Sequence, residues 1–104
     1  MLSLVKMALR IMTDAFDAEL LLLIAGAIRD LEIAGIIVDE SAVATHDGPI
    51  TDYTVTDALL QRAIITYCRA NFGQPDEFDR LQASYREQKA QLQYAAGYRE
   101  GIDG

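Results

Sequence analysis

The segment at residues 63–73, "AIITYCRANFG", sets the strongest limit on how this chain can fold. Its first ten residues fit one helix, and Arg69 is the only charged residue among the eleven. Such a helix offers apolar surface around most of its circumference, which is more than a helix covered on one side needs. A chain of 104 residues forms one small domain, and folding leaves roughly a third or more of the surface of such a domain uncovered. We therefore expect both internal packing and a neighbouring copy of the chain to cover this helix.

Apolar residues at helical spacing predict an all-α domain that resembles a small four-helix bundle and occupies residues 1–96. Ser3 is the expected N-cap of a short first helix, and Asp14 is that of a second helix, which Gly35 ends. Pro75 suits the first turn of the fourth helix. The residues expected in the core are Leu20, Ile24, Ile28, Leu31, Ile64, Tyr67, Phe72, Phe78, Leu81 and Tyr85.

A long loop over residues 36–55 is expected between the second and third helices, because this segment lacks a helical period and contains the Asp-Gly-Pro sequence of a turn. Its pieces "GIIV" and "SAVAT" are also compatible with a short strand or hairpin. Thr54 and Asp57 predict the start of the third helix, which Gly73 ends and which should pack antiparallel to the fourth. Residues 97–104 contain three glycines and are predicted to be a flexible C-terminal tail.

The charge of the chain is unevenly distributed. Nine Lys and Arg residues against sixteen Asp and Glu residues give a net charge of −7. Residues 11–61 contain ten acids and a single base, Arg29, which gives this part a net charge of −9. Such a stretch repels a phosphate backbone, so sequence-specific nucleic-acid binding is not expected. The simplest alternative is that these acids form a solvated face and favour the first turns of helices.

The residues that usually carry chemistry are few. His46 is the only histidine and lies in the predicted loop, so it cannot form a typical zinc site without further His or Cys ligands. Cys68 is the only cysteine and is expected to be a small buried apolar residue, because no base is indicated beside it. The loop acids do not follow the ligand order of an EF-hand. We therefore expect no enzymatic activity, metal or cofactor from the residues of one chain.

No membrane span is expected, because the longest apolar run, residues 20–28, is far shorter than the roughly 20 residues that a bilayer requires. The first ten residues lack a small-residue cleavage site, so no signal peptide is expected either. Together with the single cysteine, this favours synthesis in a reducing cytoplasm.

Three motifs in a fixed order resemble one known family. The chain opens with a Val-Lys-x-x-Leu-Arg-Ile pattern, continues with an "LL..LI..A" helix and then carries an Ala-Ile-x-x-Tyr-x-x-x-x-Phe-Gly helix. Over residues 4–95 this layout resembles the head-tail connector family of tailed bacteriophages and prophages. The matching residues are Val5, Lys6, Leu9, Arg10 and Ile11, then Leu20 through Ala27, then Ala63, Ile64, Tyr67, Phe72 and Gly73.

The resemblance implies a structural protein that forms a dodecameric ring under the portal, extends the DNA channel and offers a platform for the neck, stopper or tail protein. It implies a place at the head-tail interface of the virion, reached from the host cytoplasm during assembly, and DNA that passes through the channel without specific binding. The candidate acidic residues that line or border this channel are Asp39, Glu40, Asp47 and Asp52. The candidate residues of a docking tail, which would order against the portal or a neighbouring copy, are Tyr94, Tyr98, Arg99 and Ile102.

Two other classes remain open from the sequence. A small acidic helical regulator or antitoxin-like interaction protein would share the composition, and would be a stable dimer that binds a basic partner. A structural protein of another helical assembly would share the surplus apolar surface but would not bind a portal.

Overall fold

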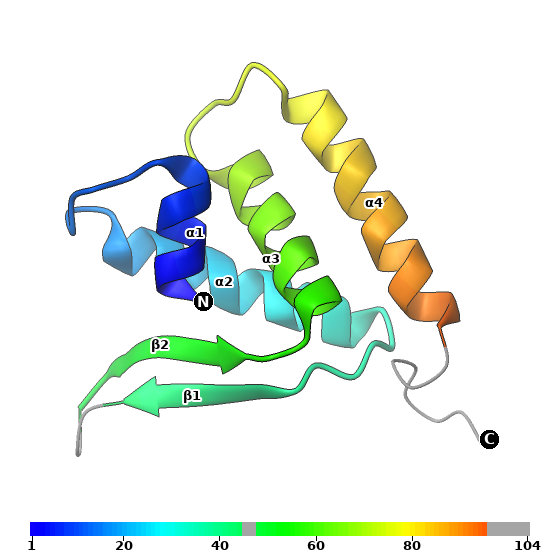
Figure 1. Cartoon of the computed structure of the whole chain (residues 1–104), viewed down its shortest axis with the longest axis horizontal. Helices are drawn as coiled ribbons and strands as arrows, with labels where there is room; N and C mark the ends of the chain where they lie inside the picture. The colour runs from blue at the N-terminus through cyan, green and yellow to red at the C-terminus, as the bar shows by residue number, and fades with distance from the viewer. Residues whose placement is uncertain (45–47, 96–104) are drawn as a thin grey trace.

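The computed structural model describes residues 1–44 and 48–95, which form four helices and a two-stranded antiparallel sheet (Figure 1). The predicted all-α class is therefore wrong. The strands of a β-hairpin lie between Glu40 and Val55, within the segment over residues 36–55 that was expected to be a loop. In chain order the elements are α1 (Leu2–Leu9), α2 (Asp17–Ile33), β1 (Glu40–Ala44), β2 (Ile50–Val55), α3 (Ala58–Asn71) and α4 (Phe78–Tyr94).

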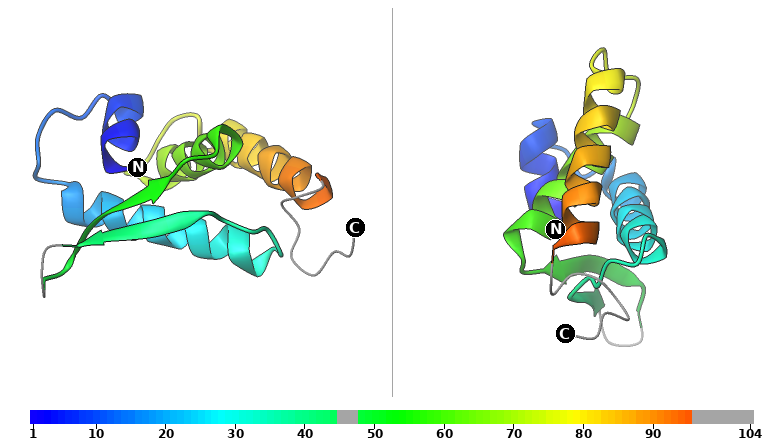
Figure 2. Two further views of the ribbon diagram at one scale, coloured as in Figure 1. Left: turned by 60° about the horizontal axis from the view of Figure 1, so that its bottom comes forward. Right: turned by 90° about the vertical axis from the view of Figure 1, so that its right-hand side faces the viewer.

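The helices form two layers. In Figure 1, α1, α3 and α4 lie side by side and α2 crosses behind α1 and α3, and both views of Figure 2 agree with this arrangement. The molecule is a flat slab with extents of 44 × 39 × 19 Å. α3 is the central helix and packs against α1, α2 and α4, so the helix with the most apolar surface contacts all the others. The hairpin runs along the lower edge of the slab in Figure 1.

The core forms where α2 and α3 cross. Seven of the ten predicted core residues are buried, and Tyr67 and Phe72 are partly buried against them. The prediction that Phe78 lies in the core is wrong, because Phe78 is the first residue of α4 and its side chain is 42% exposed. The buried cluster consists of Met1, Val5, Leu20, Ile24, Ala27, Ile28, Leu31, Ile36, Val55, Leu60, Ala63, Ile64, Cys68, Tyr85 and Leu92.

Several predicted helix starts are displaced. Asp57 caps α3 as expected, and its side chain accepts hydrogen bonds from the backbone N–H groups of Leu59 and Leu60. Ser3 instead lies inside α1, whose N-cap is Met1, and Asp14 precedes α2, whose N-cap is Phe16. The fourth helix begins at Phe78 rather than at Pro75, and Thr54 lies in β2.

The predicted stop of α2 is confirmed by its hydrogen bonds. Gly35 has φ +86° and its N–H donates to the carbonyl of Glu32, while the N–H of Ile36 donates to the carbonyl of Leu31. These two bonds are those of a Schellman motif, which requires the left-handed conformation that glycine adopts without strain. Ile36 is then buried, so the same motif that ends α2 turns the chain back towards the core.

A polar cluster ties α4 to α2. The hydroxyl of Tyr85 donates to Asp30 Oδ2 at 2.5 Å, and Lys89 Nζ lies 3.2 Å from the same oxygen. Burial, together with the hydrogen bond to the Asp30 carboxylate, raises the pKa of Tyr85. The ring of Tyr85 also meets Tyr67 edge-on at 5.3 Å between centroids. This cluster fixes the position of α4, which otherwise packs mainly on α3.

Candidate functional site

The hairpin is the part of the molecule that projects furthest from the helical layers (Figures 1 and 2). Its register pairs Glu40 with Val55 and Val43 with Asp52, and a bulge follows Val43. Every residue of β1 is exposed, and β2 becomes buried only at its last residue, Val55. A two-stranded hairpin is at best marginally stable alone, so it depends on contacts at its base.

The four acids predicted at the channel occupy different environments. Asp39 precedes β1 and accepts a hydrogen bond from the hydroxyl of Thr56 at 2.6 Å. Glu40 is exposed at the first position of β1. Asp52 lies on β2 and is partly buried, whereas Asp47 lies outside the described residues. The structure therefore brings two of the predicted acids, Asp39 and Glu40, together at the base of the hairpin and separates Asp52 from them.

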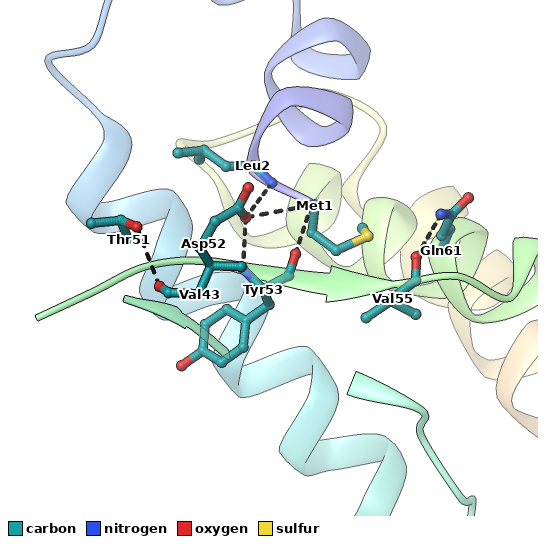
Figure 3. Close-up of polar contacts among 8 residues, drawn as sticks. All are labelled: Met1, Leu2, Val43, Thr51, Asp52, Tyr53, Val55 and Gln61. Atoms are coloured by element: carbon teal, nitrogen blue, oxygen red, sulfur yellow. Dashed lines mark hydrogen bonds and ion pairs between the residues drawn. The ribbon is translucent and has the colours of Figure 1, made fainter. Parts of the chain in front are cut away.

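Asp52 anchors α1 to the hairpin (Figure 3). Its Oδ1 accepts hydrogen bonds from the backbone N–H of Leu2 at 2.9 Å and from that of Tyr53 at 2.7 Å, and it lies 3.3 Å from the amino group of Met1. α1 has no side-chain cap of its own, so Asp52 performs the role of an N-cap residue from a strand about fifty residues away. The amino group of Met1 also donates to the carbonyl of Tyr53 at 2.8 Å.

The electrostatics of Asp52 follow from these contacts. Burial by itself raises the pKa of this carboxyl, but the hydrogen bonds from Leu2 and Tyr53 and the positive Met1 amino group lower it more, so the pKa lies below its usual value of 3.8. Asp52 is therefore ionised at neutral pH. Its charge is directed at the start of α1.

Two further hydrogen bonds hold the strands. The side-chain amide of Gln61, on α3, donates to the carbonyl of Val55 at 2.6 Å, and the hydroxyl of Thr51 donates to the carbonyl of Val43 at 3.2 Å (Figure 3). The base of the hairpin is thus fixed to both α1 and α3, while its far end has no such support among the described residues. No sequence signal pointed to Gln61 or Leu2, because both contact the hairpin only through tertiary structure.

The hairpin and the segments beside it contain no Lys or Arg. None occurs between Arg29 and Arg62, so the charged residues of this stretch are acids when His46 is counted as neutral. A surface of this kind repels phosphate groups. Within residues 1–44 and 48–95, no group of three or more His, Cys, Asp and Glu residues could hold a metal ion, and no helix is long and apolar enough to cross a bilayer.

The single cysteine matches its predicted role. Cys68 is buried in α3, and burial raises the pKa of its thiol to about 12. A thiol with such a pKa is a poor nucleophile at neutral pH. His46 lies outside the described residues.

Only one of the predicted tail residues can be placed. Tyr94 is the last residue of α4 and its side chain is exposed. Tyr98, Arg99 and Ile102 lie outside the described residues, as does the whole predicted tail over residues 97–104.

Comparison with known proteins gives one match. A family model described as "Phage connector protein" matches residues 1–99. No curated protein and no solved structure matches the chain significantly. The family match covers the four helices and the hairpin, and it favours the interpretation as a connector over the regulator or antitoxin-like alternative.

Proposed function

Because the chain belongs to the phage connector protein family, we propose that it is a head-tail connector that forms a ring under the portal. In this proposal the ring is dodecameric, extends the DNA channel and presents a platform for the neck, stopper or tail protein. The protein then acts at the head-tail interface of the virion and is assembled in the host cytoplasm. It performs no chemical step and needs no cofactor.

The observation that carries the channel role is the exposed acidic hairpin. Asp39 and Glu40 lie where the hairpin joins the helices, and no Lys or Arg occurs from β1 to the start of α3. A channel wall that attracted phosphate would hold the genome, whereas a wall with negative charge lets DNA slide past. We assign this wall to the hairpin, with Asp47 as a further member from the same connection.

The role of docking to the portal or to a neighbouring copy is assigned to the exposed end of α4. Tyr94 is an exposed aromatic residue, and aromatic side chains are enriched among the residues that contribute most to protein interfaces. Together with Tyr98, Arg99 and Ile102 it would contact the portal or a neighbouring copy. Tyr94→Ala should lower attachment to portal-bearing heads without changing the melting temperature. Unchanged attachment would move the docking role to the hairpin.

The connector function is tested in a phage or prophage whose copy of this coding sequence is disrupted. We expect DNA-filled heads and free tails to accumulate separately, and the purified protein added to the lysate should restore joined particles. Particles that join at the parental yield without the protein would refute the proposal.

The channel role is tested by reversing charge at two places. Virions with Asp39→Lys and Glu40→Lys should eject DNA more slowly than virions with Asp76→Lys and Glu87→Lys. The second pair makes the same change in net charge at exposed positions near and on α4. Equal ejection rates for the two variants would show that the hairpin does not border the channel.

A further inference from the structure

The outer face of α2 carries two exposed large apolar residues. The side chains of Leu22 and Ile33 are 75% and 72% exposed. They are eleven residues apart, which is three helical turns, so they lie on the same face. Other residues of α2, such as Leu20, Ile24 and Leu31, fill the core, and the face with Leu22 and Ile33 points away from it.

The outer face of α3 lies on the opposite side of the slab. α2 packs behind α3, and α1 and α4 contact α3 along its flanks (Figures 1 and 2). The side of α3 that faces away from α2 is therefore not covered by another helix of the described chain. On that helix Leu59 is 45% exposed, and Arg62 and Arg69 are exposed. Leu59 and Arg62 are three residues apart and are therefore neighbours on the helix surface.

The two faces differ in charge. Glu19, one turn before Leu22, is exposed and forms no ion pair with the described residues, and Arg62 likewise forms none. The guanidinium of Arg69 lies 4.0 Å from the carboxylate of Glu77, which is a long distance for an ion pair. Among the described residues, the α2 face thus offers a carboxylate without an ion pair beside an apolar residue, and the α3 face offers a guanidinium without an ion pair beside an apolar residue.

We propose that the outer face of α2 packs against the outer face of α3 of a second copy of this chain, with Leu22 against Leu59 and with Glu19 opposite Arg62. The inference rests on the proposed ring, because it names the surfaces that join its subunits. The contact uses different surfaces on the two copies, so repeating it closes a ring when the rotation allows. Packed helices lie about 8–10 Å apart, so a stack of copies in which α2 and α3 layers alternate would repeat every 16–20 Å or so. The thickness of one copy, 19 Å, agrees with this repeat.

The arrangement is tested by disulfide cross-linking of the full chain. A variant with Leu22→Cys and Leu59→Cys has two accessible thiols on opposite sides, while the native Cys68 is buried. Mild oxidation with dissolved oxygen should give a ladder of trimers and longer oligomers on a non-reducing gel. The control pairs Leu59→Cys with Met12→Cys, which is 99% exposed but lies before α2. A ladder no stronger than that of the control would overturn the proposal.

A second measurement reads association without cross-linking. Sedimentation velocity up to about 1 mM protein should show oligomers for the parent and for Met12→Arg, but monomers for Leu22→Arg. Because Leu22 is exposed in the single copy, Leu22→Arg should keep the parental melting temperature within the small range usual for surface substitutions. Glu19→Arg and Arg62→Glu should each weaken association roughly fivefold, and the two together should restore it. A parent that stays monomeric, or a Leu22→Arg variant that associates normally, would overturn the contact.

These measurements involve neither heads nor tails. Rings that form through α2 and α3 but fail to join heads to tails would refute the proposed function and leave this contact standing. Head-tail joining at the parental yield by the Leu22→Arg variant would refute this contact and leave the proposed function standing.

Discussion

Replacing Asp52 by Ala should destabilise the whole domain, although the residue lies on a two-stranded hairpin at the molecular surface. The substitution removes the acceptor of the N–H groups of Leu2 and Tyr53 and the partner of the Met1 amino group. α1 has no side-chain cap of its own, so its first turn loses its only such partner among the described residues. Val5 is the fully buried residue of α1, so its packing then depends on a helix whose start is free to fray.

The size of the effect follows from these contacts. Loss of an N-cap costs about 0.5–2 kcal/mol, and an ion pair at a site as exposed as this one, with 34% of the Asp52 side chain accessible, adds at most about 1 kcal/mol. We expect a loss of about 2 kcal/mol in the free energy of unfolding. For a domain of this size that corresponds to a fall of roughly 8–16 °C in the melting temperature. Asp52→Asn keeps one oxygen acceptor and loses the charge, so it should cost roughly half as much.

The assay is urea unfolding followed by circular dichroism, repeated across pH. The pKa of Asp52 is lower in the folded protein than its usual value of 3.8, so its contribution is fully present above that value and is lost as the pH falls through the folded pKa. The difference between the parent and Asp52→Asn should therefore be constant at neutral pH and shrink below about pH 4. Glu40→Gln is the control, because it removes an exposed acid of the same hairpin and should change stability by less than about 0.5 kcal/mol.

Two results would refute this reasoning. An Asp52→Ala variant as stable as Glu40→Gln would show that the anchor contributes nothing. A difference between the parent and Asp52→Asn that persists unchanged at low pH would show that the carboxylate charge is not the cause.

Three further predictions concern the helices. Asp30→Ala should cost about 1–3 kcal/mol because it leaves the Tyr85 hydroxyl without an acceptor, and adding Tyr85→Phe should recover part of the loss in the same unfolding assay; strict additivity would contradict this. Ile64→Asp buries an unpaired carboxylate at a fully buried position and should leave the protein unfolded by circular dichroism, so a variant that melts like the parent would reject this core. The thiol of Cys68, whose pKa burial raises to about 12, should react with alkylating reagents near pH 8 only after unfolding, and rapid labelling of the native protein would show that it is accessible.

The helices could be predicted from sequence because their signals are local. The stops at Gly35 and Gly73, both at positive φ, and the cap at Asp57 each depend on residues within one turn. The starts at Ser3 and Asp14 were wrong because tertiary contacts replaced the local caps. Asp14 instead pairs with the side chain of Lys6, which joins α1 to the approach of α2.

The hairpin had a weaker signal: the piece "SAVAT" was compatible with a strand, and β1 includes its first four residues, but the pattern did not require one. A half-buried strand shows alternating apolar and polar residues, but every residue of β1 is exposed and none needs to be apolar. What fixes the hairpin is its contact with Leu2 and Gln61, and neither contact has a sequence signature. Phe78 shows the opposite error, because here a local pattern suggested burial that the tertiary structure does not provide. Its spacing is helical, but α4 starts at this residue, before the helix reaches its packing surface on α3.

The different surroundings of the hairpin acids decide how the channel role can be tested. Asp52 supports α1, so a variant that neutralised all four predicted acids would combine a loss of channel charge with a loss of stability. A change in DNA ejection would then have two explanations. Within residues 1–44 and 48–95, the side chain of Glu40 has no partner that its replacement would strand, and that of Asp39 bonds only the exposed hydroxyl of Thr56. Charge reversal at these two positions changes the field at the hairpin while leaving the Asp52 anchor intact, so a change in DNA ejection would come from the surface charge itself.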